Sequence, residues 1–74
     1  MPEAQAWAAL ACELEAGRPC ALVVVAERRG SGPGWPGALL AVGVGGPLAG
    51  TIGGGPSEEA LAAEVAAGLA RGAL

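Results

Sequence analysis

The sequence predicts a small single domain of the α+β class, in which two helices flank a three-stranded sheet in the order α-β-β-β-α. Three observations carry this prediction. Apolar residues recur at helical spacing near both ends of the chain, and a short valine-rich run follows the first of these segments. Glycine and proline then divide the apolar middle of the chain into strand-sized pieces. A length of 74 residues fits one domain, which we take to span residues 1–74.

The first helix is expected over residues 2–16. Pro2 suits a first helical turn, and Gly17 followed by Pro19 is a typical helix end. Four residues recur on one side of such a helix: Trp7, Leu10, Ala11 and Leu14. This side is predicted to be the buried one, because the glutamates of the segment lie off it.

Three strands are expected in the middle of the chain. Residues 20–26 form a continuous apolar run with consecutive valines, which predicts a strand buried on both faces. Residues 38–44 and 48–52 form the second and third strands. The short Gly-Gly-Pro connection between them predicts a hairpin. The proline-framed loop over residues 30–37 is expected to be irregular in direction.

The second helix is expected over residues 56–71. Pro56 fits the first helical position with Gly55 as its cap, and Glu58 lies in the first turn, where the helix dipole favours a negative charge. The predicted apolar ridge consists of Leu61, Val65 and Leu69. Gly68 is expected to permit a close approach of the helix to its neighbour.

Few side chains suited to catalysis are present. The chain has four basic and seven acidic residues, a net charge of −3 and no histidine. Without histidine, a His general base and a His metal ligand are excluded, and the chain lacks the basic stripe that predicts nucleic-acid binding. We therefore expect no enzyme, no catalytic or metal-binding residue and no nucleic-acid partner.

The cysteines and the uncharged middle of the chain indicate in which cellular compartment the protein is expected, and whether it enters a membrane. Cys12 and Cys20 are eight residues apart, a spacing that fits neither a CxxC redox pair nor a zinc site. We expect two small buried thiols in a reducing cytoplasm. No charge occurs between residues 30 and 57, but prolines and glycine pairs interrupt this stretch throughout. The stretch therefore predicts buried strands and no membrane partner.

Three consecutive glycines, Gly53, Gly54 and Gly55, join the third strand to the second helix. Glycine permits positive φ, and the start of a helix exposes N–H groups at the positive end of its dipole. This junction is a candidate cradle for an anion or a phosphate. The alternative is a tight strand-to-helix turn that binds nothing, because a lone glycine cluster is a weak motif.

Two glycine-bearing segments together carry a family resemblance. Residues 29–38 read R-G-S-G-P-G-W-P-G-A, and residues 50–55 read G-T-I-G-G-G. A strand before the first, a hairpin between them and a helix after the second resemble the N-terminal domain of the XdhC/CoxI family. These proteins are maturation factors for molybdenum hydroxylases such as xanthine dehydrogenase. The resemblance covers residues 20–60 and implies a stand-alone, divergent domain of this family.

The resemblance implies a ligand as well as a fold. Family members are thought to bind molybdenum cofactor and to pass it to the apo-enzyme. The cofactor-binding residues implied here are Gly53, Gly54, Gly55, Ser57, Ser31 and Thr51. The chain departs from the family pattern at Gly32, Gly34, Leu39 and Pro56, where the family has serine, arginine, a basic residue and cysteine. These departures remove a phosphate-pairing cation and a reactive thiol but keep the backbone glycines.

Two functions therefore stay open. The first is a non-catalytic interaction or accessory module, a homo-oligomer or a partner of a molybdenum hydroxylase or of a separate maturation factor. Its sequence support is the alanine- and glycine-rich core and the apolar Trp35 on a proline-framed loop. The alternative is a protein that binds molybdenum cofactor or another phosphate ligand at residues 53–55. In an oligomer Trp35 would be an anchor residue, whereas in a monomer it would fold back onto the sheet.

Overall fold

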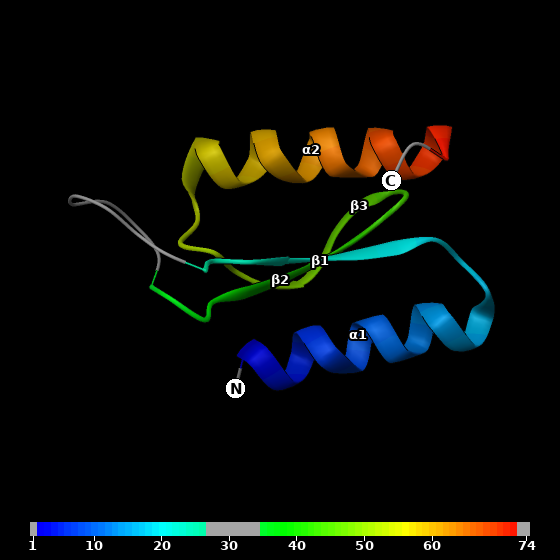
Figure 1. The fold of residues 1–74 in the computed structure, drawn as a ribbon, viewed down its shortest axis with the longest axis horizontal. Helices are drawn as coiled ribbons and strands as arrows, with labels where there is room; N and C mark the ends of the chain where they lie inside the picture. The colour runs from blue at the N-terminus through cyan, green and yellow to red at the C-terminus, as the bar shows by residue number, and fades with distance from the viewer. Residues whose placement is uncertain (1, 27–34, 73–74) are drawn as a thin grey trace.

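The computed structural model describes residues 2–26 and 35–72, and Figure 1 shows their arrangement. The elements are α1 (Pro2–Ala16), β1 (Cys20–Val24), β2 (Leu39–Gly43), β3 (Gly46–Gly50) and α2 (Gly55–Arg71). This order confirms the predicted α-β-β-β-α fold with two helices and one sheet. Of the predicted loop over residues 30–37, positions 30–34 lie outside the described residues.

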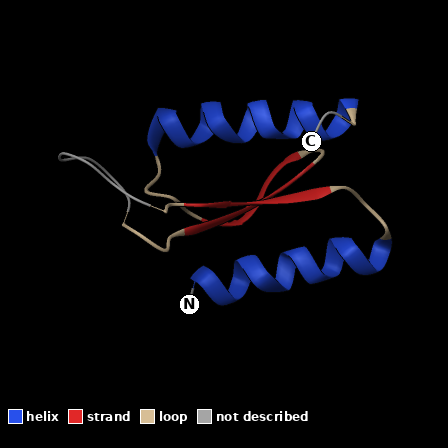
Figure 2. Cartoon of the chain, in the orientation of Figure 1, coloured by secondary structure: helices blue, strands red, loops and turns tan. Residues whose placement is uncertain are grey.

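The two helices cover opposite faces of the sheet (Figure 2). The strand order is β1-β2-β3, and both pairs are antiparallel, so β2 is the central strand. The β2–β3 hairpin is confirmed, although β3 begins and ends two residues earlier than predicted. The short apolar turn between the strands fixes this pairing.

The core consists of two small layers on either side of β2, all of whose residues are buried. Towards α1, Leu39 and Ala41 pack with Ala6 and Leu10. Towards α2, the second layer consists of Leu40, Val42, Ala62 and Ala66. Neighbouring residues of a strand point to opposite faces, and both faces of β2 are covered, so β2 is apolar throughout.

The prediction that the first strand is buried on both faces is wrong. The strand β1 lies at the edge of the sheet, and its residues from Cys20 to Val23 are only half-buried. Val24 is 50% exposed. Both helices lie mainly over β2 and β3, so they cover the two faces of β1 less completely. As an edge strand, β1 also pairs with only one other strand of the described sheet.

The predicted buried face of the first helix is also wrong in part. Leu10 is buried, but Ala11 is exposed, and Trp7 and Leu14 are 56% and 69% exposed. Ala6 is fully buried in their place. The helix therefore presents Ala6 and Leu10 to the sheet and leaves its largest side chain, Trp7, outside.

Close approach of α1 to β3 explains this rotation. At Gly50, which has φ +87°, an added Cβ would lie 2.2 Å from the carbonyl oxygen of Leu39 and 3.2 Å from the Cβ of Ala6. Only glycine fits at this position. A helix that packs against a glycine through an alanine lies too near the sheet for a tryptophan to be placed between them.

The helix α2 begins one residue before the predicted start, with Gly54 as its N-cap, and ends at Gly72 in a left-handed conformation. Of the predicted ridge, Leu69 is buried and Val65 is partly buried, whereas Leu61 is 36% exposed. Gly68 is buried. The buried residues of α2 are mainly small, with Ala62, Ala66 and Gly68 beside Leu69.

Candidate functional site

The candidate site is the turn that joins β3 to α2, residues 51–55, called the glycine turn below. Its three glycines all have positive φ: 125° at Gly53, 82° at Gly54 and 81° at Gly55. Side chains other than glycine rarely adopt this left-handed region. The glycine triplet is therefore required by the backbone path of the turn, independently of any ligand.

A carboxylate of the same chain lies inside the glycine turn. One oxygen of Glu58, Oε1, accepts hydrogen bonds from the Thr51 hydroxyl at 2.6 Å, the Ile52 N–H at 2.7 Å and the Gly54 N–H at 3.0 Å. The Gly53 N–H donates to the Thr51 hydroxyl oxygen at 3.0 Å. This first-turn acid reaches back to N–H groups that precede its helix, much as the glutamate of a capping box does.

The hydrogen bonds stabilise the charged form of Glu58. Its pKa lies below the ordinary value of a glutamate, chiefly because of the Thr51 hydroxyl and then the Ile52 N–H. Partial burial opposes this lowering, and the Gly54 N–H supports it. Glu58 therefore remains ionised at neutral pH and places a negative charge at the positive end of the α2 dipole.

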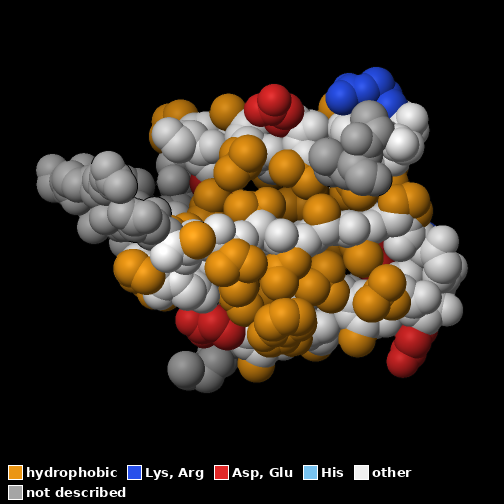
Figure 3. Space-filling view, in the orientation of Figure 1, with side chains coloured by type: hydrophobic (Ala, Val, Ile, Leu, Met, Phe, Trp, Pro, Cys, Tyr) orange, Lys and Arg blue, Asp and Glu red, His pale blue; other side chains and the backbone are white. Residues whose placement is uncertain are grey.

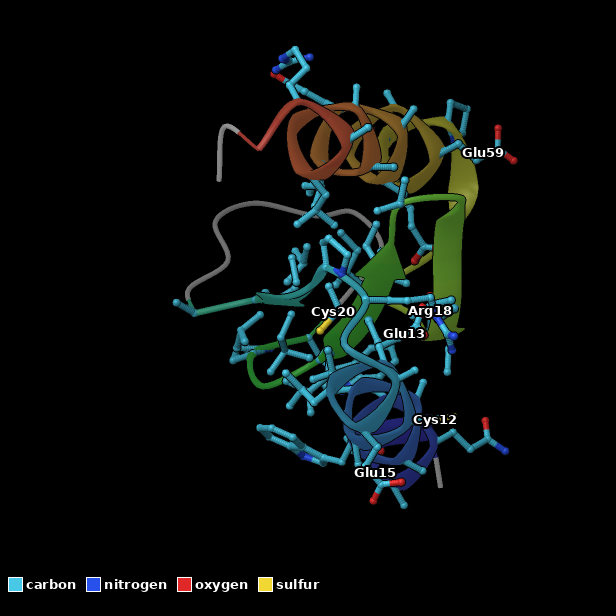
Figure 4. All side chains as sticks on the ribbon, turned by 90° about the vertical axis from the view of Figure 1, so that its right-hand side faces the viewer. Cys12, Glu13, Glu15, Arg18, Cys20 and Glu59 are labelled. Carbon is cyan, nitrogen blue, oxygen red and sulfur yellow. The ribbon has the colours of Figure 1, made fainter. Side chains whose placement is uncertain are left out.

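The neighbouring acid does not share this environment. Glu59 points away from the sheet (Figure 4) and is exposed. Two consecutive glutamates near the start of one helix thus differ in role. One is bonded to the backbone of the preceding turn, and the other faces solvent, which makes the second a matched control for the first.

The structure brings together only part of the predicted cofactor-binding set. Thr51, Gly53 and Gly54 lie in the hydrogen-bonded arrangement around Glu58, whereas Gly55 and Ser57 are exposed beside it. Ser31 lies outside the described residues. Sequence reasoning gave Glu58 only a dipole role and missed it as the organiser of the turn. The available signal was an acid three residues after the last glycine.

An anionic cofactor does not fit the glycine turn in this arrangement. The N–H groups of Ile52 and Gly54 already have an anionic acceptor, and a phosphate would meet the Glu58 carboxylate. Within residues 2–26 and 35–72 no pocket is found. The assignment of cofactor binding to these residues stays a prediction, and no chemical step is derived from it.

The cysteines differ from their expected burial. Cys12 is exposed on α1, so the prediction of a buried thiol is wrong there, because the helix is rotated relative to the predicted face. Cys20 is half-buried, and Figure 4 shows it between the sheet and α1. Among the described residues, no group of His, Cys, Asp or Glu side chains is arranged to hold a metal ion. Nor does the described part of the chain contain a helix long and apolar enough to cross a membrane.

The fold and the turn define a class of protein: a small domain with a sheet between two helices, in which a carboxylate of the chain accepts the hydrogen bonds of the glycine turn. The model of the XdhC and CoxI family matches residues 13–74. The chain therefore belongs to the XdhC and CoxI family. The resemblance inferred from the glycine-bearing segments is confirmed. Neither the curated proteins nor the solved structures contain a match to the chain.

Proposed function

We propose that this chain is a non-catalytic interaction module in the maturation of molybdenum enzymes, and that it acts as an oligomer. Membership of the XdhC and CoxI family connects the chain with that process. The observation that carries the interaction role is the apolar surface of the domain. Trp7, Leu14 and Val24 are each at least half exposed, and Trp35 is 43% exposed.

This exposed surface is large relative to the core that supports it. The largest fully buried side chains are Leu40 and Val42, and the rest of the core is mainly alanine. A domain of this size is only marginally stable from its own burial, and exposed tryptophans are typical anchors of protein interfaces. Association would cover the tryptophans and add to the buried apolar area.

The glycine turn supports the same proposal. The Thr51 hydroxyl and the N–H groups of Ile52 and Gly54 donate to Glu58, so the feature that most resembles a ligand cradle has a structural role within the chain. The alternative, binding of molybdenum cofactor or another phosphate ligand at residues 53–55, requires displacement of that carboxylate. Titration with inorganic phosphate and with molybdopterin, followed by the amide chemical shifts of the three glycines, tests it. Shifts at these amides would favour the alternative.

The maturation role is tested on a molybdenum hydroxylase from the same source. The enzyme is produced with and without the chain, and its molybdenum content per subunit is measured together with its activity. We expect both quantities to fall together when the chain is absent. An enzyme that is fully loaded without the chain would contradict the proposal.

The interaction surface is tested with the two tryptophans. Trp7→Ala and Trp35→Ala are compared with the wild-type chain by sedimentation equilibrium and by thermal unfolding. We expect a lower oligomer mass for at least one of these variants, because an interface loses an anchor. An unchanged mass with only a lower melting temperature would assign the tryptophans to the stability of the single domain.

A further inference from the structure

The outer edge of β1 carries hydrogen-bonding groups that β2 does not use. The Val25 N–H donates to the carbonyl oxygen of Ala38 at 3.0 Å, so the backbone of Val25 faces β2. In an antiparallel ladder these groups alternate between the two sides of a strand. The N–H and C=O groups of Leu22 and Val24 therefore point to the edge that has no neighbouring strand among residues 2–26 and 35–72.

The two edges of the sheet differ in their protection against further pairing. The other edge strand, β3, contains Pro47, and its pairing with β2 shifts register between Ala41 and Val42. Proline and irregular register are features by which natural sheets block an edge. The strand β1 reads C-A-L-V-V, pairs with β2 in an unbroken register, and has no charge and no proline.

The surface on either side of this edge is apolar. Figure 3 shows hydrophobic side chains gathered above and below β1, over the sheet and over both helices, with the charged side chains at the margins. Val24 is 50% exposed at the end of the strand. An incoming strand would therefore gain backbone hydrogen bonds along the edge and apolar contacts on both sides of it.

From this arrangement we propose that a second copy of the chain occupies the edge, with β1 paired antiparallel to β1 of the other copy. The inference rests on the proposed oligomeric function and assigns its interface. A two-fold axis presents the same strand in opposite directions, so an antiparallel edge is complementary to itself. The outward groups of Leu22 and Val24 then pair with the same groups of the other copy. The two sheets become one six-stranded sheet.

Charge and area favour a second copy as the occupant. Each chain carries a net charge of −3, but β1 is uncharged, so the pairing places no acidic groups directly opposite each other. A stable dimer buries about 800 Å² per partner, which is roughly a sixth of the 4498 Å² surface of the described chain. A strand of five residues is too short to bury this area alone. The apolar side chains beside it supply the remainder.

The test compares two lysine substitutions at similarly exposed positions on opposite edges. Val24→Lys places a charge on the β1 edge, and Leu48→Lys places one on β3, where the exposed fraction is 42% against 50% for Val24. Sedimentation equilibrium of the wild-type chain should give twice the mass of 7.0 kDa. We expect Val24→Lys to weaken the dimer by about tenfold or more and Leu48→Lys to leave it unchanged.

Amide hydrogen exchange shows which surface forms the interface. The Leu22 and Val24 amides should exchange slowly in the wild-type dimer and rapidly in the monomer of Val24→Lys, while the β2 amides stay protected in both. A dimer with rapid exchange at Leu22 and Val24 would overturn the edge assignment and leave the oligomeric function standing. A wild-type monomer would overturn both. Edge protection that arises only when an apo-molybdenum hydroxylase is added would overturn the second copy as the occupant. The molybdenum content of the enzyme tests the maturation role separately from all of these outcomes.

Discussion

The turn that follows β3 and the outer edge of β1 differ in how their backbone hydrogen-bonding groups are satisfied. Beyond β3, the chain enters the glycine turn, where the donors of Ile52 and Gly54 are bonded to Glu58. Along β1, the outward groups of Leu22 and Val24 face no other strand in the part of the chain that the structure describes. The comparison teaches that a polar backbone group on a small domain is satisfied within the chain where a side chain can reach it. Where none can reach, as along β1, it is open to solvent or to the second copy proposed above.

Mutations in β3 and in the glycine turn should lower the stability of the domain more than mutations along β1. The largest loss is expected for Gly50→Ala. The added Cβ would lie 2.2 Å from a backbone oxygen, and the φ of +87° disfavours alanine. We expect a loss of about 3 kcal/mol or more in the free energy of unfolding, measured by urea denaturation. Gly45→Ala is the control, because no atom lies within 4 Å of its added Cβ. Equal stability of the two variants would show that Gly50 does not lie against the Leu39 carbonyl group with a positive φ as described.

The next largest loss of stability is expected for Glu58→Ala, which acts on the glycine turn. This variant removes the acceptor of three hydrogen bonds, whereas Glu59→Ala removes an exposed carboxylate at the next position of the same helix. We expect Glu58→Ala to lose about 2 kcal/mol in the free energy of unfolding relative to Glu59→Ala. Both variants gain the same helix propensity, so the difference between them reports the hydrogen bonds together with the closer position of Glu58 to the positive end of the helix dipole. Equal free energies would mean that solvent replaces Glu58 without loss.

The order of the elements could be predicted from the sequence, but the position of each strand within the sheet could not. Residues 20–24 and 39–43 are both apolar throughout, so composition does not tell the edge strand from the central one. That difference depends on how the chain connects the strands. The face of α1 was missed for another reason. Helical periodicity predicts that the face with large apolar side chains such as Trp7 is buried. In the structure the helix packs closely against Gly50, and only a small side chain such as Ala6 fits between them.

The backbone conformation of the three glycines in the candidate site could be predicted from the sequence, but the role of Glu58 as the hydrogen-bond acceptor could not. Three consecutive glycines at a strand-to-helix junction predict positive φ, and all three have it. The side chain that their N–H groups bind could not be inferred, because Glu58 reaches Ile52 and Gly54 only once the turn has curled back over the helix start. An acid in a first turn has an adequate dipole role without any such bond.

The smallest expected effect is on the pH dependence of stability. The folded pKa of Glu58 lies below its unfolded value, so its contribution is fully present above the ordinary glutamate pKa of about 4.3 and is lost as pH falls through the folded pKa. Glu58→Gln keeps the shape of the side chain and removes this titration. The free energy of unfolding of the wild-type chain should therefore exceed that of Glu58→Gln at neutral pH, and the gap should close between about pH 5 and the folded pKa. The other glutamates are present in both proteins, so their contributions cancel in the difference between the two free energies of unfolding. A difference in the free energy of unfolding that stays constant down to acidic pH would contradict this prediction. It would show that the charged carboxylate of Glu58 accepts these hydrogen bonds no more strongly than the neutral one.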